Sequence, residues 1–360
     1  AEARTLRALY YFNLVRFFGD VPLILDLKTV EDSKGPRDSK ELIYDQIIED
    51  LTFAEEHLPL RSEYSASDEG RINKGAAKIL FGKVYLTKGD FQKAKDKLAE
   101  VVEHESEYGF GLHKDYHANW LRDTEAGIEA VLYIEYKEPP FQHNGEMALA
   151  GPKYSIPGSL GISALNEADI PTQELYDQFD NRDLRKKTNF KTEFAHLKTG
   201  EILKSSIPLS GKFWVEGLET GDRCDVNMHI IRYADAILMY AEALNEVGES
   251  TKALAMLNRI RERAFGDDSG NFKPMSKDEF RTAILNERRL EFPHEGHRWF
   301  DLVRTGTFIQ RMKEHSAYEA KVAEANKTEI AQNIKEHMIL MPIPQSEIDL
   351  NPNLVQNAGY

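Results

Sequence analysis

Apolar residues recur every three or four positions along most of the chain, which is the spacing of amphipathic helices packed on a core. Leu6, Leu9 and Phe17 follow this spacing before Gly19. Ile43 and Ile47 follow it in a segment that ends at a proline, and both glycine and proline are typical helix ends. The pattern predicts helices over residues 1–18, 38–58, 276–291 and 317–334.

Two of these predicted helices begin with a capping-box spacing, in which a short polar residue precedes a glutamate by three positions. Asp38 with Glu41 has this spacing, and so does Ser276 with Glu279. Each pair therefore predicts a helix start at its first member.

Two segments, residues 72–103 and 231–262, resemble each other when aligned without gaps. Each has the pattern of a helix, a glycine turn and a second helix, with small residues where the helices cross. Small residues let antiparallel helices approach closely, and glycine adopts the positive φ that ends a helix. This pattern predicts a tetratricopeptide-like pair twice; two unrelated hairpins sharing a turn type are the alternative. The matched pairs are Gly82 with Ala241, Gly89 with Gly248, Ala94 with Ala253 and Leu98 with Leu257.

Residues 105–226 separate the two pairs and lack a helical period over most of their length. Residues 129–136 predict a strand, and glycines and prolines predict turns around it. Long irregular segments in compact proteins are functional or disordered, and this one is too rich in aromatic residues for disorder. We therefore expect a helical scaffold that displays a recognition segment, with Trp120 in the core. The aromatic residues are Tyr116, Trp120, Phe141, Tyr154, Phe190, Phe213 and Trp214.

Charge and composition narrow the class of protein. The 360 residues carry a net charge of −14, which argues against a nucleic-acid binder because phosphate recognition needs a positive face. Cys224 is the only cysteine, so an intramolecular disulfide is excluded. No apolar run has the length needed to cross a bilayer.

A search for catalytic or metal-binding patterns gives little. His294 and His297 are three apart with a glycine between them, whereas a helical zinc site places its histidines four apart. They are expected to buttress a tight turn. Asp177, Asp180 and Asp183 lack the glycine of a calcium-binding loop. No phosphate-binding glycine loop or nucleophile elbow is present in the sequence, so we expect no enzyme activity, no metal and no cofactor.

Charged residues are dense in residues 287–304, where Glu287 and Glu291 occur close to several arginines. Carboxylates this close resemble an acid/base pair. So many neighbouring arginines favour an ion-pair network with lowered carboxyl pKa values instead.

Four segments resemble signatures of the SusD/RagB family, in the order expected for that family. They are ARTLRALYYFNLVRFFGDVPL at 3–23, RYADAILMYAEA at 232–243, ILNERRLEFPHEGHRWFDLVRTG at 284–306 and LMPIPQSEIDLNPNL at 340–354. The resemblance weakens in residues 105–226.

The resemblance implies a mainly α fold, a right-handed superhelix of tetratricopeptide units with a loop-rich, partly β insertion. It divides residues 1–360 into the N-terminal helices and first pair (1–104), a ligand-binding insertion (105–226), and the second pair with the signature region (227–360). Arg288, Glu291, Arg298 and Asp301 are then expected to tie the C-terminal segment to the repeats.

The resemblance also implies a function. Family members are surface-exposed lipoproteins of the outer membrane of Bacteroidota, and they capture a nutrient, most often a glycan, for a SusC-like TonB-dependent transporter. Members have further residues before the position of Ala1, including a lipidated cysteine, so this chain is expected to lack its anchor and part of the ligand site.

A sugar presents an apolar face and a polar rim, so a glycan site needs aromatic rings beside polar groups. The candidates are expected in the insertion, on the turn after the predicted strand, in the Gly/Pro-rich stretch and before the second repeat. They are Phe141, His143, Asn144, Tyr154 and Trp214.

Three alternatives remain open at this point. The candidate turn holds one aromatic residue, which suits a RagB-type member that captures peptides. An intracellular tetratricopeptide scaffold for protein–protein interaction would show the same helix pairs. A glycoside hydrolase is disfavoured because the sequence lacks an isolated carboxylate pair.

Overall fold

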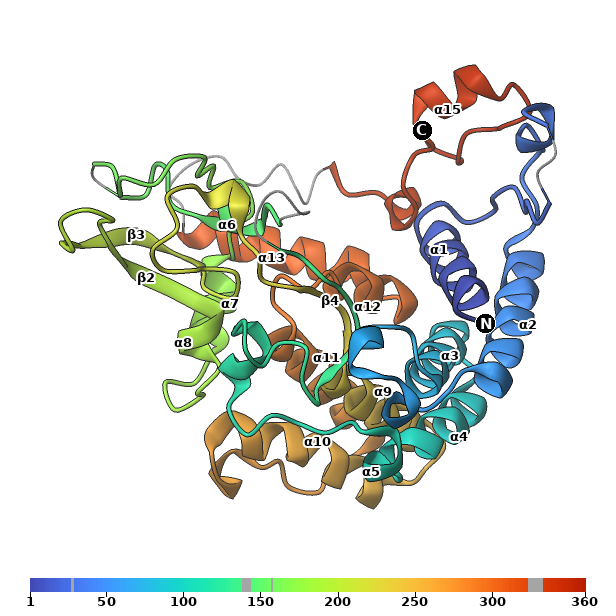
Figure 1. Cartoon of the computed structure of the whole chain (residues 1–360), viewed down its shortest axis with the longest axis horizontal. Helices are drawn as coiled ribbons and strands as arrows, with labels where there is room; N and C mark the ends of the chain where they lie inside the picture. Colours follow the sequence, from blue (N-terminus) through green and yellow to red (C-terminus); the bar gives the residue numbers. More distant parts are fainter. Residues whose placement is uncertain (27–28, 138–143, 157, 323–332) are drawn as a thin grey trace. The chain divides into compact units, whose positions relative to one another are not determined.

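The computed structural model describes residues 1–26, 29–137, 144–156, 158–322 and 333–360 (Figure 1). The described chain is mainly helical, as expected from the sequence. It also has two sheets of two strands each. No helix in these ranges has the length and apolar character to cross a membrane. The chain forms two compact units. The first unit contains Ala1–Glu63, Arg71–Lys88 and Trp299–Tyr360, and the second contains Tyr64–Gly70 and Gly89–Arg298.

Three helices build the core of the first unit: α1 (Glu2–Phe18), α2 (Lys40–His57) and α3 (Lys74–Lys88). Helix α2 packs against both α1 and α3. One charged group is buried among them: Asp50 accepts two hydrogen bonds from the Arg7 guanidinium, at 2.7 and 2.6 Å. The apolar core residues include Ala8, Phe12, Ile43, Ile47, Leu51, Ile79, Leu80 and Val84.

The N-cap of helix α2 lies one residue later than the Asp38 cap that the sequence predicts. It is Ser39, whose Oγ accepts the Leu42 N–H at 3.4 Å. The Asp38 carboxylate instead accepts the Leu23 N–H at 2.7 Å, and so holds the segment that follows α1. The predicted Asp38 cap was therefore wrong, because a contact distant in sequence uses that carboxylate.

The C-terminal part of the first unit contains α12 (Arg298–Arg304), α13 (Phe308–Val322), η7 (Glu336–Ile339) and α15 (Gln345–Leu350). Gly306 has φ +67 and separates α12 from α13. Helix α13 begins at Phe308, nine residues before residue 317, where the sequence predicts the start of the last helix. Most of the rest of that predicted helix lies outside the described residues.

An aromatic cluster joins this C-terminal part to α1. The Phe17 ring stacks on Trp299, with ring centroids 5.4 Å apart, and contacts Phe300 at 4.9 Å.

The second unit contains α4 (Phe91–Val102), which packs on α9 (Tyr233–Glu246), and α9 packs on α10 (Ser250–Phe265). The turn glycines of both predicted repeats adopt positive φ, +78 at Gly89 and +90 at Gly248. Each predicted repeat therefore has its helix, glycine turn and second helix. Helix α9 is buried along nearly its whole length.

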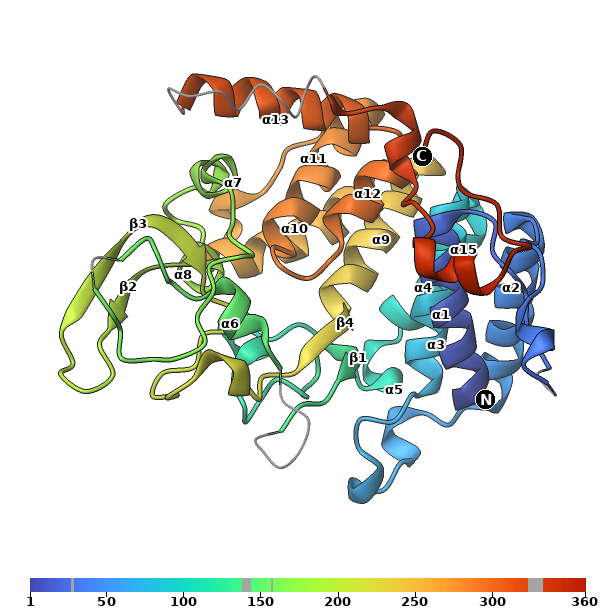
Figure 2. The same cartoon turned by 90° about the horizontal axis from the view of Figure 1, so that it is seen from above.

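Helix α11 (Lys277–Glu291) lies beside α9 and α10 (Figures 1 and 2). Its predicted start is confirmed. Ser276 Oγ accepts the Glu279 N–H at 3.3 Å, and the Glu279 carboxylate accepts the Ser276 N–H at 2.8 Å.

The insertion contains strands from both sheets. Strand β1 (Ala130–Ile134) confirms the predicted strand and pairs antiparallel with β4 (Met228–Arg232). Strands β2 (Phe190–Ala195) and β3 (Ile202–Ser210) form a hairpin that the sequence reading missed. The remaining elements are η1 (Glu31–Ser33), η2 (Arg61–Glu63), η3 (Ala66–Asp68), α5 (Glu105–Tyr108), η4 (Tyr116–Trp120), α6 (Glu146–Ala150), α7 (Gln173–Gln178), α8 (Lys186–Asn189), η5 (Gly221–Arg223) and η6 (Asp268–Gly270).

A separate apolar cluster lies inside the insertion. Trp120 is only 4% exposed, which confirms the prediction that it is a core residue. Its buried neighbours are Tyr116, Met147, Phe213, Cys224 and Val226.

Candidate functional site

A buried ion-pair network in the second unit is centred on Glu291. Glu291, at the end of α11, is fully buried and contacts three arginines from different parts of the second unit. Its carboxylate oxygens lie 3.0 Å from Arg185, 3.0 Å from Arg232 and 2.5 Å from Arg263. The network therefore joins the insertion, β4 and α10 to α11.

Charge decides the ionisation state of this carboxyl group. Burial alone would raise the pKa of Glu291, but Arg263, Arg232 and Arg185 outweigh burial and lower it to about 2. The predicted ion-pair network with a lowered carboxyl pKa is confirmed at Glu291. A group that stays ionised at neutral pH is unsuited to act as a general acid.

The residues expected to tie the signature segment to the repeats divide into two groups. Arg288 joins α11 to α9 through Asp235, at 2.7 Å, and Glu291 reaches α10, as expected. Arg298 donates to the Leu285 carbonyl at 3.3 Å, and Asp301 pairs with Arg304 at 2.9 Å; both contacts lie within the signature segment itself.

The histidines and aspartates considered as metal ligands bind other partners. His294, at φ +59 in a turn, contacts Asp169 at 3.1 Å, and this hydrogen bond lowers the pKa of Asp169. Asp180 and Asp183 each pair with an arginine two positions on, at 2.7 Å. Within the described ranges, no group of three or more His, Cys, Asp or Glu side chains is arranged to hold a metal ion.

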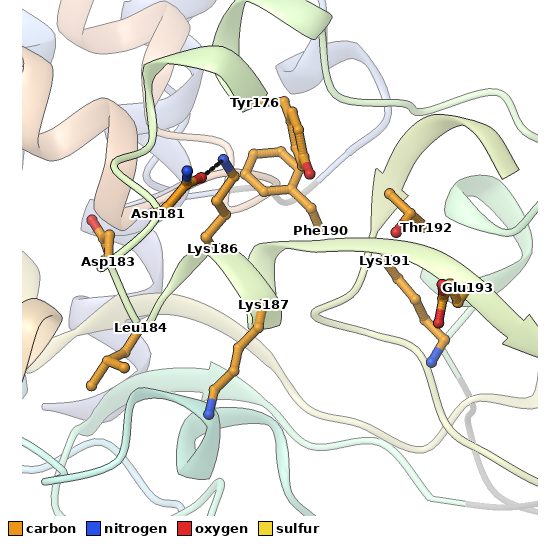
Figure 3. Close-up of a pocket in the computed structure, with 10 residues that line it drawn as sticks. All are labelled: Tyr176, Asn181, Asp183, Leu184, Lys186, Lys187, Phe190, Lys191, Thr192 and Glu193. Atoms are coloured by element: carbon orange, nitrogen blue, oxygen red, sulfur yellow. Dashed lines mark hydrogen bonds between the residues drawn. The ribbon is translucent and has the colours of Figure 1, made fainter. Parts of the chain in front are cut away.

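A cavity of about 440 Å³ opens between α7, α8 and β2 in the second unit (Figure 3). Its lining combines aromatic, amide, ammonium and carboxylate groups, all from the insertion. The lining residues are Tyr176, Asn181, Asp183, Leu184, Lys186, Lys187, Phe190, Lys191, Thr192 and Glu193.

Aromatic rings form one wall of this cavity. Tyr176 meets Phe190 edge-on, with ring centroids 5.1 Å apart and an interplanar angle of 80°. Phe179 packs on Phe190 from another direction, also at 5.1 Å, and both phenylalanines are buried. Tyr176 is only partly buried, so part of its surface remains accessible to a ligand.

The polar groups beside this wall are held in place by the loop before α8. Lys186 Nζ donates to Asn181 Oδ1 at 3.1 Å and to the Phe179 carbonyl at 3.3 Å. It also lies 4.4 Å from the centre of the Tyr176 ring, within range of a cation–π interaction. Figure 3 shows the Lys186 ammonium beside Asn181 and the two rings.

Arg185 anchors this loop from inside the protein. Its guanidinium is fully buried and binds both Asp183 oxygens, at 3.0 and 2.7 Å, besides its contact with Glu291. The Glu291 network thus fixes the backbone from which Lys186 and Lys187 project.

Trp214, a predicted ligand residue, is partly buried and packs against β2. Its ring packs edge-on against Phe194, with centroids 4.7 Å apart, and its Nε1 is buried. Lys191 Nζ lies 5.9 Å from the Trp214 ring and 2.8 Å from Glu216. Trp214 therefore supports the strand that lines the cavity.

Tyr154, a second predicted ligand residue, is 76% exposed on a loop of the insertion. The Glu167 carboxylate holds this loop by accepting the backbone N–H groups of Lys153 at 2.7 Å and Ser155 at 3.0 Å, besides that of Tyr154. Partial burial opposes ionisation of Glu167, but these donors outweigh it and lower the pKa of that carboxyl. The loop also contacts β3, where Ser206 N–H donates to the Ser155 carbonyl at 2.9 Å.

Asn144 is buried, and its side chain is used by the fold. Its Nδ2 donates to the Val226 carbonyl at 2.8 Å, and its Oδ1 accepts the Glu146 N–H. Phe141 and His143 lie outside the described residues. Of the five predicted residues, the structure describes Asn144, Tyr154 and Trp214, and ligand contact by any of the five stays a prediction.

The cavity residues were missed because their signals are weak in sequence. Phe190 was one of the insertion's aromatic residues, but its partner Tyr176 lies fourteen positions earlier in the chain, in a six-residue helix. Lysines at 186, 187 and 191 close to Phe190 were the available sign of a polar site beside an aromatic wall.

Helix pairs carrying an insertion with an aromatic and polar cavity define a helical scaffold protein. Comparison with known proteins identifies the family. The family model described as "SusD family" matches residues 212–360, and one described as "Starch-binding associating with outer membrane" matches residues 1–86. The chain belongs to the SusD family.

Relatives extend across the whole chain. It is 30% identical to SusD-like protein P2 of Formosa agariphila, covering 100% of this chain and 74% of that protein. It is 31% identical to starch-binding protein SusD of Bacteroides thetaiotaomicron, and the match covers 100% of this chain and 72% of that protein. A solved structure of a laminarin-binding SusD-like protein matches with a TM-score of 0.78 and 28% identity, covering 100% of this chain and 78% of that one. Two of these three relatives are named for binding a glycan, starch in one and laminarin in the other.

Proposed function

We propose that this protein captures a glycan at the cell surface and delivers it to a SusC-like TonB-dependent transporter in the outer membrane, to which a lipid anchor attaches it. Membership of the SusD family supports this function, as do relatives named for binding starch and laminarin. The family description "associating with outer membrane" supports the location.

The observation that carries the proposal is the cavity between α7, α8 and β2. An accessible Tyr176 ring offers an apolar surface for the C–H face of a sugar. Asn181 and Lys186, beside that ring, offer polar groups for hydroxyl oxygens. Cavities of several hundred Å³ with an apolar wall and a few polar groups are typical of small-ligand sites, and this one is about 440 Å³.

Replacing Tyr176 by alanine is expected to weaken glycan binding about tenfold, because an aromatic contact contributes about 0.5–1.5 kcal/mol beyond its buried area. The measurement is isothermal titration calorimetry with an oligosaccharide chosen from a screen of glycans. Tyr10→Ala is the control, since Tyr10 is 62% exposed on α1 and does not line the cavity. Equal affinities of Tyr176→Ala and the unchanged protein would place the ligand elsewhere.

The same screen separates glycan capture from its alternatives. Peptides are included, and binding of peptides without any glycan would support a RagB-type function. The transporter partnership has a separate test, which is purification from native membranes and identification of any β-barrel protein that co-purifies. A cytosolic fraction containing all of the protein would contradict both the location and the partnership.

A further inference from the structure

We propose that the cavity between α7, α8 and β2 selects glycans that carry anionic groups, either carboxylates or sulfate esters. This inference rests on the proposed function and specifies its ligand class. Three lysines line the cavity, Lys186, Lys187 and Lys191, and they come from one short stretch of α8 and β2.

The two carboxylates of the lining have cations of their own. Both Asp183 oxygens are bound by the buried Arg185. Glu193 pairs with Lys204 of β3 at 3.0 Å, and both of these side chains are exposed. Neither carboxylate therefore neutralises the lining lysines.

Two of the three lysines have no carboxylate partner among the described residues. Lys186 uses two of its three N–H donors on neutral oxygens, those of Asn181 and Phe179, so one donor remains for a ligand. Lys187 is exposed. Lys191 pairs with Glu216, whose side chain is 60% exposed, and exposed ion pairs contribute little to stability.

The lysines are arranged to meet a bulky ligand rather than a single ion. Figure 3 shows Lys186 beside the aromatic wall, whereas Lys187 and Lys191 extend away from it in two different directions, from α8 and β2. A sugar ring on Tyr176 would therefore lie close to the Lys186 ammonium group. Neighbouring sugar units of the same glycan would lie closer to Lys187 and Lys191.

The net negative charge of the protein bears on which ligands the cavity lysines can attract. With 60 acidic and 46 basic residues, the protein repels anions on average. A neutral glycan would gain little from a local cluster of lysines, whereas an anionic glycan needs one to overcome this repulsion.

The experiment compares each acidic glycan with its neutral counterpart. Oligogalacturonate and its methyl ester provide the carboxylate pair, and carrageenan oligosaccharides with and without sulfate provide the sulfate pair; starch and laminarin oligosaccharides are also titrated. Calorimetry is run on the full chain, on Lys187→Gln, on Lys187→Arg and on Lys198→Gln. Lys198 lies at the exposed tip of the hairpin and outside the lining, so its substitution makes the same charge change away from the cavity.

The inference predicts that at least one acidic glycan binds and that its neutral counterpart binds at least tenfold more weakly. Lys187→Gln should weaken acidic binding about tenfold, since a charge-assisted hydrogen bond contributes about that factor. Lys187→Arg should retain binding, and Lys198→Gln should match the unchanged protein. Which pair shows the difference tells carboxylate from sulfate recognition.

Two results would overturn the inference, and only the second would also reject the proposed glycan capture. If a glycan binds but its acidic and neutral forms bind equally, or Lys187→Gln has no effect, anion selection is wrong and glycan capture stands. If no glycan in the panel binds, both the inference and the proposed function are rejected.

Discussion

Replacing Glu291 by glutamine is expected to lower the free energy of unfolding by about 3–5 kcal/mol, the usual cost of removing one partner from a buried ion pair. Three arginines contact this carboxylate in a region closed to water, and the substitution leaves their charge without its central anion. Urea unfolding followed by circular dichroism at neutral pH measures the difference.

The matched control is Glu193→Gln, which makes the same chemical change in a pair whose side chains are 56% and 77% exposed. Exposed pairs contribute about 0–1 kcal/mol, so this variant should unfold nearly as the unchanged protein does. Similar losses in the two variants would contradict the assignment of a central role to Glu291.

The pH dependence follows from the same carboxyl group. Its pKa is lowered to about 2 in the folded protein, against about 4.3 for an unperturbed glutamate. Its contribution to stability is therefore complete above about pH 4.3 and is lost as the pH falls towards 2. In Glu291→Gln this part of the acid sensitivity should be missing.

Replacing Phe194 by alanine is the second change expected to have a large effect, a loss of about 3–5 kcal/mol from the packing of a buried aromatic side chain. Phe194 is 1% exposed and packs with Ile156 and Leu160, besides its contact with Trp214. Hydrogen exchange followed by mass spectrometry should show the greatest loss of protection in β2 and β3.

This variant also links packing to binding, because Phe194 holds the strand from which Lys191 and Glu193 line the cavity. Glycan affinity should therefore fall together with hairpin protection. Ile202→Ala is the control, since Ile202 is 56% exposed on β3 and its loss should change stability by no more than about 0.5 kcal/mol. Unchanged exchange in the hairpin of Phe194→Ala would contradict this account of the site.

Features set by local sequence were predictable. The glycine turns at Gly89 and Gly248 and the cap at Ser276 depend on residues close together in the chain. Asp38 shows the limit of this approach, since its carboxylate binds the Leu23 N–H and leaves the cap to the next residue.

The candidate site depends on contacts that the sequence alone does not reveal. Trp214 is an aromatic residue shortly before the second repeat, and only the structure shows that it packs on Phe194 of β2. Tyr176 becomes a candidate only because folding places Phe190 against it. Burial of Asn144 likewise depends on its bond to Val226, far along the chain.

The family signature and the ligand site also differ in how they can be found. Residues 284–306 resemble a family signature, and this segment contributes Arg288 and Glu291 to the buried ion pairs. The insertion supplies the cavity, and it lies largely between the segments matched by the two family models. Family membership therefore predicts the scaffold well and the ligand contacts poorly.

A crystal structure of the protein with an oligosaccharide selected by the screen tests the central claim most directly. The account predicts a sugar ring on Tyr176, with polar contacts to Asn181 or Lys186. A bound sugar that contacts none of these three residues, for example one stacked on Tyr154 alone, would contradict the assignment of this cavity as the glycan site.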